Sequence, residues 1–230
     1  MAIKRLNSKV ISSGEYKVIL SPDVVSDIFS SILPFFYADS VQKDKSIFKD
    51  KLNKKIASDK ITLIEDPNNE KLCGKRLFDD EAVNTIYKEI IKDGILKMYL
   101  YNLKSSKKDK TQSTGNGYIS DIETGVRNMY VKPSNISFDN LIRDMKYGLY
   151  INRVTGTHAG INPNNGNISL QSMGYIIEDG KITDALQPFI MTTDFKTLLK
   201  NIEDVGNDLT FNSEQFGSPS IKISKVNISS

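Results

Sequence analysis

Histidine, cysteine and clustered acids are the residue types that could carry out catalysis or bind a metal ion here, and they are scarce. The 230 residues include one histidine, His158, and one cysteine, Cys73. Zinc sites and most general-base mechanisms use histidine, often two or three of them, so His158 cannot build a two-histidine metal site by itself. No nucleophile motif lies near it. We expect His158 to lie in a turn-rich loop with a structural role, and Cys73 to be a small buried hydrophobic residue.

Three adjacent acids, Asp79-Asp80-Glu81, are the other group that could bind a hard cation or do acid/base work. Consecutive side chains point in different directions on a strand or helix and rarely converge on one ion. We therefore expect a solvated turn. The glycine, serine and threonine residues within residues 104–117 could cradle a phosphate, but they lack the spacing and the Gly-Lys-Ser/Thr ending of a P-loop. The low apolar content of this stretch predicts an exposed, mobile loop.

Composition and charge are those of a folded globular protein without a strong electrostatic preference. Hydrophobic residues make up 39% and charged residues 26%, and the net charge is +3. Nucleic acid is therefore not an expected partner. Residues 43–60 carry seven lysines but also three aspartates, which predicts a solvated, partly helical surface. A single cysteine suits a reducing compartment, and no window approaches the roughly 18 apolar residues of a membrane span, so we expect a cytoplasmic protein.

The elements that must position these residues begin with a strand and a helix. Residues 15–20 read as a strand, after which Ser21 supplies an N-cap and Pro22 a first-turn proline. Apolar residues then recur at spacings of three and four, so one face of the helix is expected to be buried. Pro34 should disturb this helix because proline lacks a backbone N–H.

Hairpins and short strands dominate the remaining pattern. The Asp-Gly pairs at residues 93–94 and 179–180 each separate two β-rich runs, a strong signal for a tight hairpin. Further strands are expected at residues 61–64, 128–131, 149–154 and 220–228, and further helices after Ser137 and from Asp194 to Val205. Strands that do not alternate regularly with helices predict an α+β fold, mainly antiparallel sheet or a barrel-like β core with a few packed helices.

A series of short motifs runs in order through nearly the whole chain. They include Phe78-Asp79-Asp80-Glu81-Ala82, Ser113-Thr114-Gly115-Asn116, Met129-Tyr130-Val131-Lys132-Pro133, Gly160-Ile161-Asn162-Pro163, Met173-Gly174-Tyr175-Ile176-Ile177-Glu178-Asp179-Gly180 and Gly217-Ser218-Pro219-Ser220. Together they resemble the C-terminal domain of the PmbA/TldD family, on the PmbA (TldE) side. The resemblance implies that residues 15–230 form this domain. It also implies that residues 1–14, with a helix-like stretch at 3–10, are the tail of a missing N-terminal domain.

The family resemblance implies a two-subunit cytoplasmic protease whose TldD-type subunit holds zinc. Its ligands come from a His-Glu-x-x-x-His helix and a cysteine near the C-terminus. Alignment by eye puts Ser30, Ser31 and Phe35 at the helix positions, and the cysteine position falls near Val205. A neutral hydroxyl is a poor zinc ligand, a phenyl ring has no lone pair, and serine cannot act as the carboxylate base. We therefore expect no catalytic residue, metal ligand or cofactor in this chain.

The leading hypothesis from the sequence is a metal-free PmbA/TldE-type subunit, non-catalytic alone, of a TldD/TldE-like zinc metalloprotease complex. Its expected partners are a TldD-type zinc subunit and a peptide substrate, with a homodimer as a further option and no membrane. Two alternatives stay open. One is a regulatory binding protein of the gyrase-modulator type that uses residues 43–60. The other is a peptidase with a non-zinc site, for instance His158 with carboxylates brought close by folding.

Overall fold

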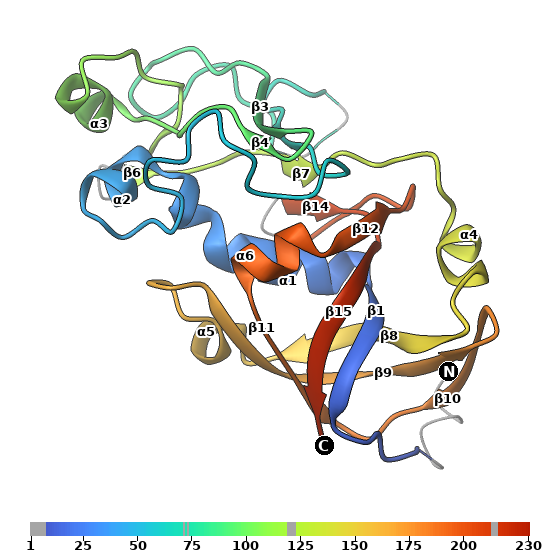
Figure 1. The fold of residues 1–230 in the computed structure, drawn as a ribbon. Coiled ribbons are helices and arrows are strands. Elements are labelled where there is room, and N and C mark those ends of the chain that lie inside the picture. The colour runs from blue at the N-terminus through green and yellow to red at the C-terminus, as the bar shows by residue number, and fades with distance from the viewer. Residues whose placement is uncertain (1–7, 71, 73, 119–122, 213–215) are drawn as a thin grey trace.

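Five strands of this chain close into a barrel, in a computed structural model that describes residues 8–70, 72, 74–118, 123–212 and 216–230 (Figure 1). The strands are β1 (Gly14–Leu20), β8 (Tyr147–Thr155), β9 (Asn167–Glu178), β11 (Phe189–Asp194) and β15 (Ile221–Ser229). They pair in this order, and β15 returns to pair with β1, which closes the ring. The β1–β8 pairing is parallel and the other four are antiparallel. The predicted α+β fold with a mainly antiparallel, barrel-like core is confirmed.

A second sheet and a short ribbon lie above the barrel in Figure 1. The second sheet has the order β13 (Thr210–Phe211), β14 (Phe216–Ser218), β7 (Met129–Val131), β2 (Leu63–Glu65), β3 (Lys88–Lys92) and β4 (Ile95–Leu96). The ribbon pairs β5 (Gly117–Tyr118) with β6 (Glu123–Thr124). Two further strands extend the barrel sheet: β10 (Lys181–Ala185) on β9 and β12 (Ile202–Val205) on β15.

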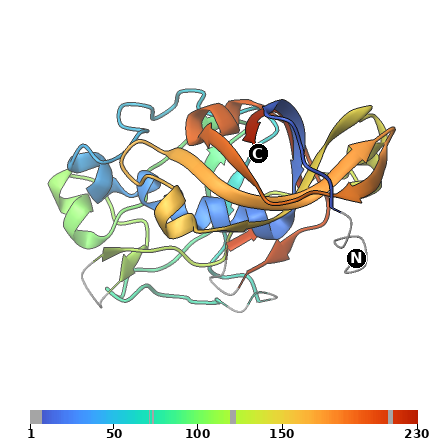
Figure 2. The ribbon, with the colours of Figure 1, turned by 90° about the horizontal axis from the view of Figure 1, so that it is seen from below.

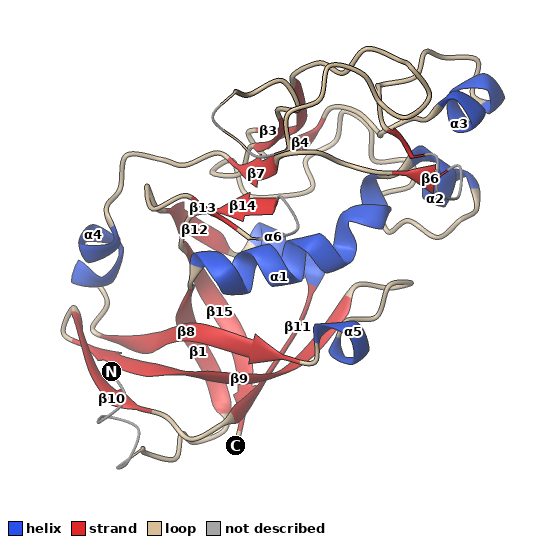
Figure 3. Cartoon of the chain, turned by 180° about the vertical axis from the view of Figure 1, so that it is seen from behind, coloured by secondary structure: helices blue, strands red, loops and turns tan. Residues whose placement is uncertain are grey.

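Helix α1 (Pro22–Ile32) runs between the barrel and the second sheet (Figure 3). As predicted, Ser21 caps it, its Oγ accepting a hydrogen bond from the Val24 amide at 3.4 Å. The helix contacts β8 of the barrel and β13 and β14 of the second sheet. Pro34 then tightens the chain into the 3-10 turn η2 (Leu33–Phe36). Because α1 is packed on both sides, the two sheets share one hydrophobic core.

The other helices are short and lie around this core. They are α2 (Ala38–Gln42), α3 (Leu103–Lys108), α4 (Phe138–Arg143), α5 (Thr157–Gly160) and α6 (Phe195–Lys200). Figure 2, seen from below, shows the long strand β9 passing across α1. In the described part of the chain, every helix is too short or too polar to cross a membrane.

Both predicted Asp-Gly hairpins form. Asp93 and Gly94 join β3 to β4 with φ values of +47° and +77°, and Asp179 and Gly180 join β9 to β10 with φ values of +45° and +72°. Two consecutive residues with positive φ are typical of the type I′ turn, whose twist matches that of the flanking strands.

The helix predicted from Asp194 to Val205 is shorter than expected. Helix α6 ends at Lys200, and the chain continues as strand β12, in which Val205 lies opposite Ile221 of β15. The apolar spacing fits a helix, but pairing with β15 decides the outcome, since β-branched residues pack well on a sheet.

The predicted exposed loop at residues 104–117 is only partly correct. Its start is helical, because Asn102 and Ser105 form a capping box at the N-terminus of α3. Its end is held inside the protein, where Asn116 is 3% exposed. The expectation of helix within residues 43–60 was wrong, since this stretch consists of turns after α2.

The N-terminal prediction is only partly open to comparison, because residues 1–7 lie outside the described residues. The described part of the stretch at 3–10 is extended and not helical. The Lys9 amide donates to the Ala185 carbonyl at 2.8 Å, and the Lys9 carbonyl accepts from the Gln187 amide at 2.9 Å. At Lys9, therefore, a short β pairing is found where the residue pattern indicated helix.

Gly94 and Gly156 share one backbone conformation but differ in surroundings, which allows a controlled test of the hairpin packing. Both have a φ of +77°, which costs an L-residue about 1–2 kcal/mol. A Cβ at Gly94 would overlap the carbonyl oxygens of Ala57 and Ser58, whereas one at Gly156 would meet nothing within 4 Å. Urea denaturation should show losses of about 1 kcal/mol for Gly156→Ala and about 2–4 kcal/mol for Gly94→Ala. Equal losses would show that the 57–58 segment simply moves aside.

Candidate functional site

The end of α1 and the turn η2 contain the residues that align with the zinc-binding helix of TldD-type subunits. Ser30 and Ser31 lie in the last turn of α1, and Phe35 lies in η2. The Ser31 hydroxyl donates to the Asp27 carbonyl at 2.9 Å. The Ser30 Oγ is buried without a hydrogen-bond partner among the described residues. The segment therefore supplies two neutral hydroxyls and a phenyl ring at the three positions.

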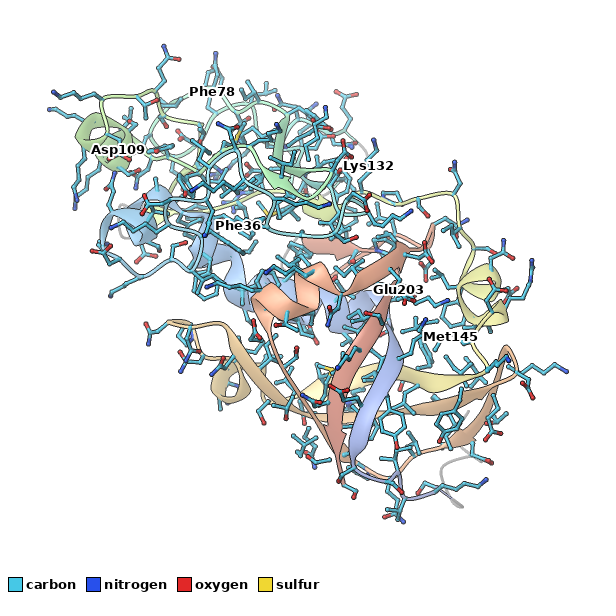
Figure 4. All side chains as sticks on the ribbon, viewed as in Figure 1. Phe36, Phe78, Asp109, Lys132, Met145 and Glu203 are labelled. Atoms are coloured by element: carbon cyan, nitrogen blue, oxygen red, sulfur yellow. The ribbon has the colours of Figure 1, made fainter. Side chains whose placement is uncertain are left out.

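Aromatic side chains pack around Phe35. The cluster consists of Phe29, Phe35, Phe36, Phe48, Phe195 and Phe216, each at most 1% exposed. Phe48 is its centre, with its ring 6.3 Å from that of Phe35, 5.2 Å from that of Phe36 and 6.2 Å from that of Phe195. Figure 4 shows Phe36 inside the molecule, near the end of α1. Such rings exclude water and offer no lone pair to zinc, so this part of the chain is a packed apolar core.

The third ligand position is also without a donor. Val205 lies in β12, is 2% exposed and pairs with Ile221. Within the residues that the structure describes, no three histidine, cysteine, aspartate or glutamate side chains are grouped so as to hold a metal ion. Cys73 lies outside those residues. The side chains at the family's ligand positions do not fit zinc.

An open groove of about 810 Å³ lies beside the aromatic cluster. Its lining comes from α5 and the following loop, from β9 and β11, and from the start of α6: Ala159, Gly160, Asn162, Asn167, Ser169, Thr192 and Asp194 are among the residues. Gly166 belongs to the same loop, and a Cβ built there would lie 3.3 Å from Phe195 and 3.5 Å from Phe35. The loop between Asn162 and Asn167, two residues of the lining, therefore lies against the aromatic cluster.

The residues in this groove are mostly small, polar and uncharged. Asp194 is the charged residue in the lining, and it caps α6: its carboxylate accepts hydrogen bonds from the Thr197 amide at 3.0 Å and the Thr197 hydroxyl at 2.6 Å. Partial burial raises the pKa of Asp194, but the hydrogen bonds from Thr197 and Lys196 outweigh it and leave the pKa below its ordinary value. The carboxylate therefore stabilises the helix and is not placed to act as a general acid.

His158 lies next to this groove but has no catalytic partner. It is exposed, in the one-turn helix α5 and not in the irregular loop that the sequence predicts. Among the described residues, no hydrogen bond or ion pair joins its side chain to a carboxylate, a serine or any other group. A general base is normally oriented by such a partner, so the hypothesis of a peptidase built on His158 gains no support from the geometry.

The acidic residues Asp79-Asp80-Glu81 form the turn that the sequence predicts, and each serves a different part of the fold. The Asp79 carboxylate accepts three backbone hydrogen bonds of 2.7–2.9 Å. Asp80 pairs with Arg76, and Glu81 accepts a hydrogen bond from the Leu103 amide at 2.7 Å. Because the three carboxylates point to different partners, they form no common cation site.

A buried ion pair in the second sheet was missed by the sequence reasoning. Lys88 Nζ lies 2.9 Å from Glu65 Oε2, and the two side chains are 1% and 2% exposed. They are directly opposite on β3 and β2. Asn116 donates to both Glu65 oxygens at 3.0 Å, and Lys88 donates to the Thr114 carbonyl at 2.7 Å. One feature of the sequence could have revealed that Lys88 is buried. Side chains alternate between the two faces of a strand, so Lys88 lies on the same buried face as Ile90.

Comparison with known sequences matches almost the whole chain to one family. The family model described as the PmbA/TldA metallopeptidase C-terminal domain covers residues 13–230. The metalloprotease PmbA homolog of Buchnera aphidicola is 30% identical over 229 residues, which are 99% of this chain and 49% of that protein. Metalloprotease PmbA of Escherichia coli O157:H7 is 29% identical, with 96% of this chain and 48% of that protein covered. The chain spans about half the length of these relatives.

Comparison with solved structures gives the same result. A candidate modulator of a DNA gyrase from Thermotoga maritima superimposes with a TM-score of 0.93 at 32% identity, over 99% of this chain and 53% of that one. TldE from Thermococcus kodakarensis superimposes with a TM-score of 0.91 at 26% identity, over 98% of this chain and 52% of that one. The barrel, the second sheet and the helix between them are therefore shared with crystal structures.

Proposed function

The chain belongs to the PmbA/TldA metallopeptidase C-terminal domain family, and on that premise we propose that it is a metal-free subunit of PmbA/TldE type. It is not catalytic alone. It acts in the cytoplasm together with a TldD-type zinc subunit, in a complex that degrades peptides or unfolded proteins. The similarity to TldE supports the choice of subunit type.

The observation that carries this proposal is the packing at the family's ligand positions. Ser30, Ser31 and Phe35 provide no zinc ligand and no carboxylate base, and the phenyl ring is part of a closed aromatic cluster. Zinc hydrolysis needs protein ligands, an open coordination position and a base for the bound water. This segment supplies none of the three, so the catalytic zinc has to come from another subunit.

The groove supports a role for this subunit in holding substrate beside the partner's zinc. Its lining of glycine, alanine, serine, threonine and asparagine offers hydrogen bonds with little steric or charge selection. Such a surface suits an extended peptide of variable sequence. A second copy of the chain is a further expected contact in the assembly.

Peptidase assays on the separate and mixed subunits test the proposal. We expect no cleavage of an unstructured fluorogenic peptide by the purified chain, and cleavage when a TldD-type subunit from the same organism is added. A zinc chelator should abolish the activity of the mixture. As a matched control, a TldD-type subunit in which the glutamate of the His-Glu-x-x-x-His helix is replaced by glutamine should leave the mixture inactive.

Cleavage by the chain alone that resists the chelator would overturn the proposal. In that case His158→Ala would show whether the exposed histidine beside the groove is responsible. Full activity of the TldD-type subunit without this chain would also contradict the role proposed here.

A further inference from the structure

Five exposed lysines from two distant parts of the chain line one concave surface, which we name the lysine pocket. Its lysines are Lys51, Lys54 and Lys55, from the turns after α2, and Lys196 and Lys200, from α6. The concavity measures about 240 Å³, and its floor is apolar, formed by Ile47, Phe48 and Ile56. A neighbouring concavity of about 410 Å³ shares Lys55, Ile56 and Lys200 with it.

The two segments that carry these lysines are fixed to each other and to the core. The Ser58 amide donates to the Leu199 carbonyl of α6 at 2.9 Å. The Asn53 amide donates to the Leu96 carbonyl at 2.7 Å, which ties the turns to β4. Below the pocket, Phe48 packs against Phe195 with ring centroids 6.2 Å apart. The positions of the lysine backbones are therefore set by the fold, although the side chains keep their freedom.

The five lysines of the pocket outnumber the acids beside them. Among the ion pairs of the described residues, none involves the five lysines, whereas Lys43 and Lys49 of the same stretch pair with Asp39 and Asp44. Two acids lie near them: Asp59, in the neighbouring concavity, and Asp194, whose pKa is lowered in part by the charge of Lys196. Several like charges converging on one concave surface attract an anionic ligand and concentrate it there.

We propose that the lysine pocket binds an acidic segment of a protein partner that inserts one apolar side chain between the lysines. The volume of about 240 Å³ lies below the ~300–1,000 Å³ of typical small-molecule pockets, which suits a single side-chain anchor. The lysines then meet carboxylates on either side of that anchor. This inference is independent of the proposed function, since it concerns a different surface and requires no zinc partner.

The lining favours an acidic peptide over a single-stranded nucleic acid. Bases are held mainly by stacking on exposed aromatic rings or on arginine. The aromatic residue of the pocket, Phe48, is 1% exposed, and the lining contains no arginine. The half-buried Ile47 offers an apolar side chain a contact surface, whereas the lining has no exposed aromatic ring on which a base could stack.

Fluorescence anisotropy with labelled probes tests this inference. The first probe is a peptide of four glutamates around a central phenylalanine, and the second has serine in place of that phenylalanine. We expect the first to bind, with an affinity that falls as salt rises, and the second to bind at least fivefold more weakly. The double variant Lys54→Glu/Lys200→Glu should bind the first probe at least tenfold more weakly.

Two further double variants and a nucleic-acid probe serve as controls for charge, for location and for the class of ligand. Lys54→Gln/Lys200→Gln, which removes charge without reversing it, should weaken binding by an intermediate factor. Lys104→Glu/Lys107→Glu, on exposed α3 outside the pocket, should bind like the unmodified chain. Equal binding of both peptides, equal effects of the two Glu variants, or tighter binding of a labelled oligothymidine at the same salt would overturn the proposal.

Discussion

Replacing Lys88 with methionine is expected to lower the free energy of unfolding by about 3–5 kcal/mol, because it leaves the Glu65 carboxylate buried without its cation. Asn116 and the Arg127 backbone amide continue to donate to that carboxylate, but neutral hydrogen bonds do not replace an ammonium ion. Urea denaturation monitored by circular dichroism measures the loss. The double variant Lys88→Met/Glu65→Gln should recover part of it, since no net charge then remains buried.

The matched control lies on the same strand. Lys92 forms an exposed ion pair with Glu89 of β3, at 2.7 Å. Lys92→Met should hardly change the denaturation midpoint, because exposed pairs are screened by solvent. A small loss for Lys88→Met, similar to that of Lys92→Met, would show that water reaches the Glu65 carboxylate and that the pair does not hold the second sheet together.

Phe35→Ala is expected to cost about 3–5 kcal/mol, because it removes a ring from the middle of the aromatic cluster and leaves a cavity. Phe35→His places the family's ligand type at this position. It should also destabilise the chain and should give no tight zinc binding, since Ser30 and Ser31 supply no further ligand. Thermal or urea denaturation with and without zinc distinguishes the loss of core packing from any stabilisation by bound zinc.

Phe78 provides the control for Phe35. It is 54% exposed and lies at the outer rim of the loops above the second sheet (Figure 4). Phe78→Ala should change the free energy of unfolding by no more than about 0.5 kcal/mol. A stabilisation by zinc of Phe35→His but not of Phe35→Ala would contradict the view that the helix has lost its metal site altogether.

Local rules predicted those parts of the fold whose structure is decided by neighbouring residues. Ser21 and Pro22 start a helix by satisfying and removing backbone donors, and Asp93-Gly94 turns a strand by adopting positive φ, whatever the rest of the chain does. The strand expected at residues 220–228 is also present, as β15.

Features that depend on distant partners could not be predicted from local pattern alone. Residues 202–205 have helical spacing but form a strand because β15 lies beside them. Asn116 is polar and lies in a stretch rich in serine and lysine. It is nevertheless buried, because its side-chain amide donates hydrogen bonds to the buried Glu65 carboxylate. The lysine pocket arises because folding brings α6 to the turns at residues 51–55.

Sequence reasoning addressed the residue types at the candidate site but not their packing. The comparison of residue types at Ser30, Ser31 and Phe35 already indicated that zinc would lack ligands there. The residue types did not predict the aromatic cluster at these positions. The cluster is assembled from α1, η2, the turn at Phe48, α6 and β14, which are far apart in the sequence. Its separate pieces have no common sequence signature.

Zinc retention is the most direct measurement of whether this chain is a metal-free subunit. The purified chain and a TldD-type subunit are dialysed separately against zinc and then against buffer, and bound zinc is determined by elemental analysis. We expect stoichiometric zinc on the TldD-type subunit and only trace zinc on this chain. One tightly held zinc ion per chain, lost on His158→Ala or Cys73→Ala, would contradict that expectation and would identify a metal site elsewhere in the chain.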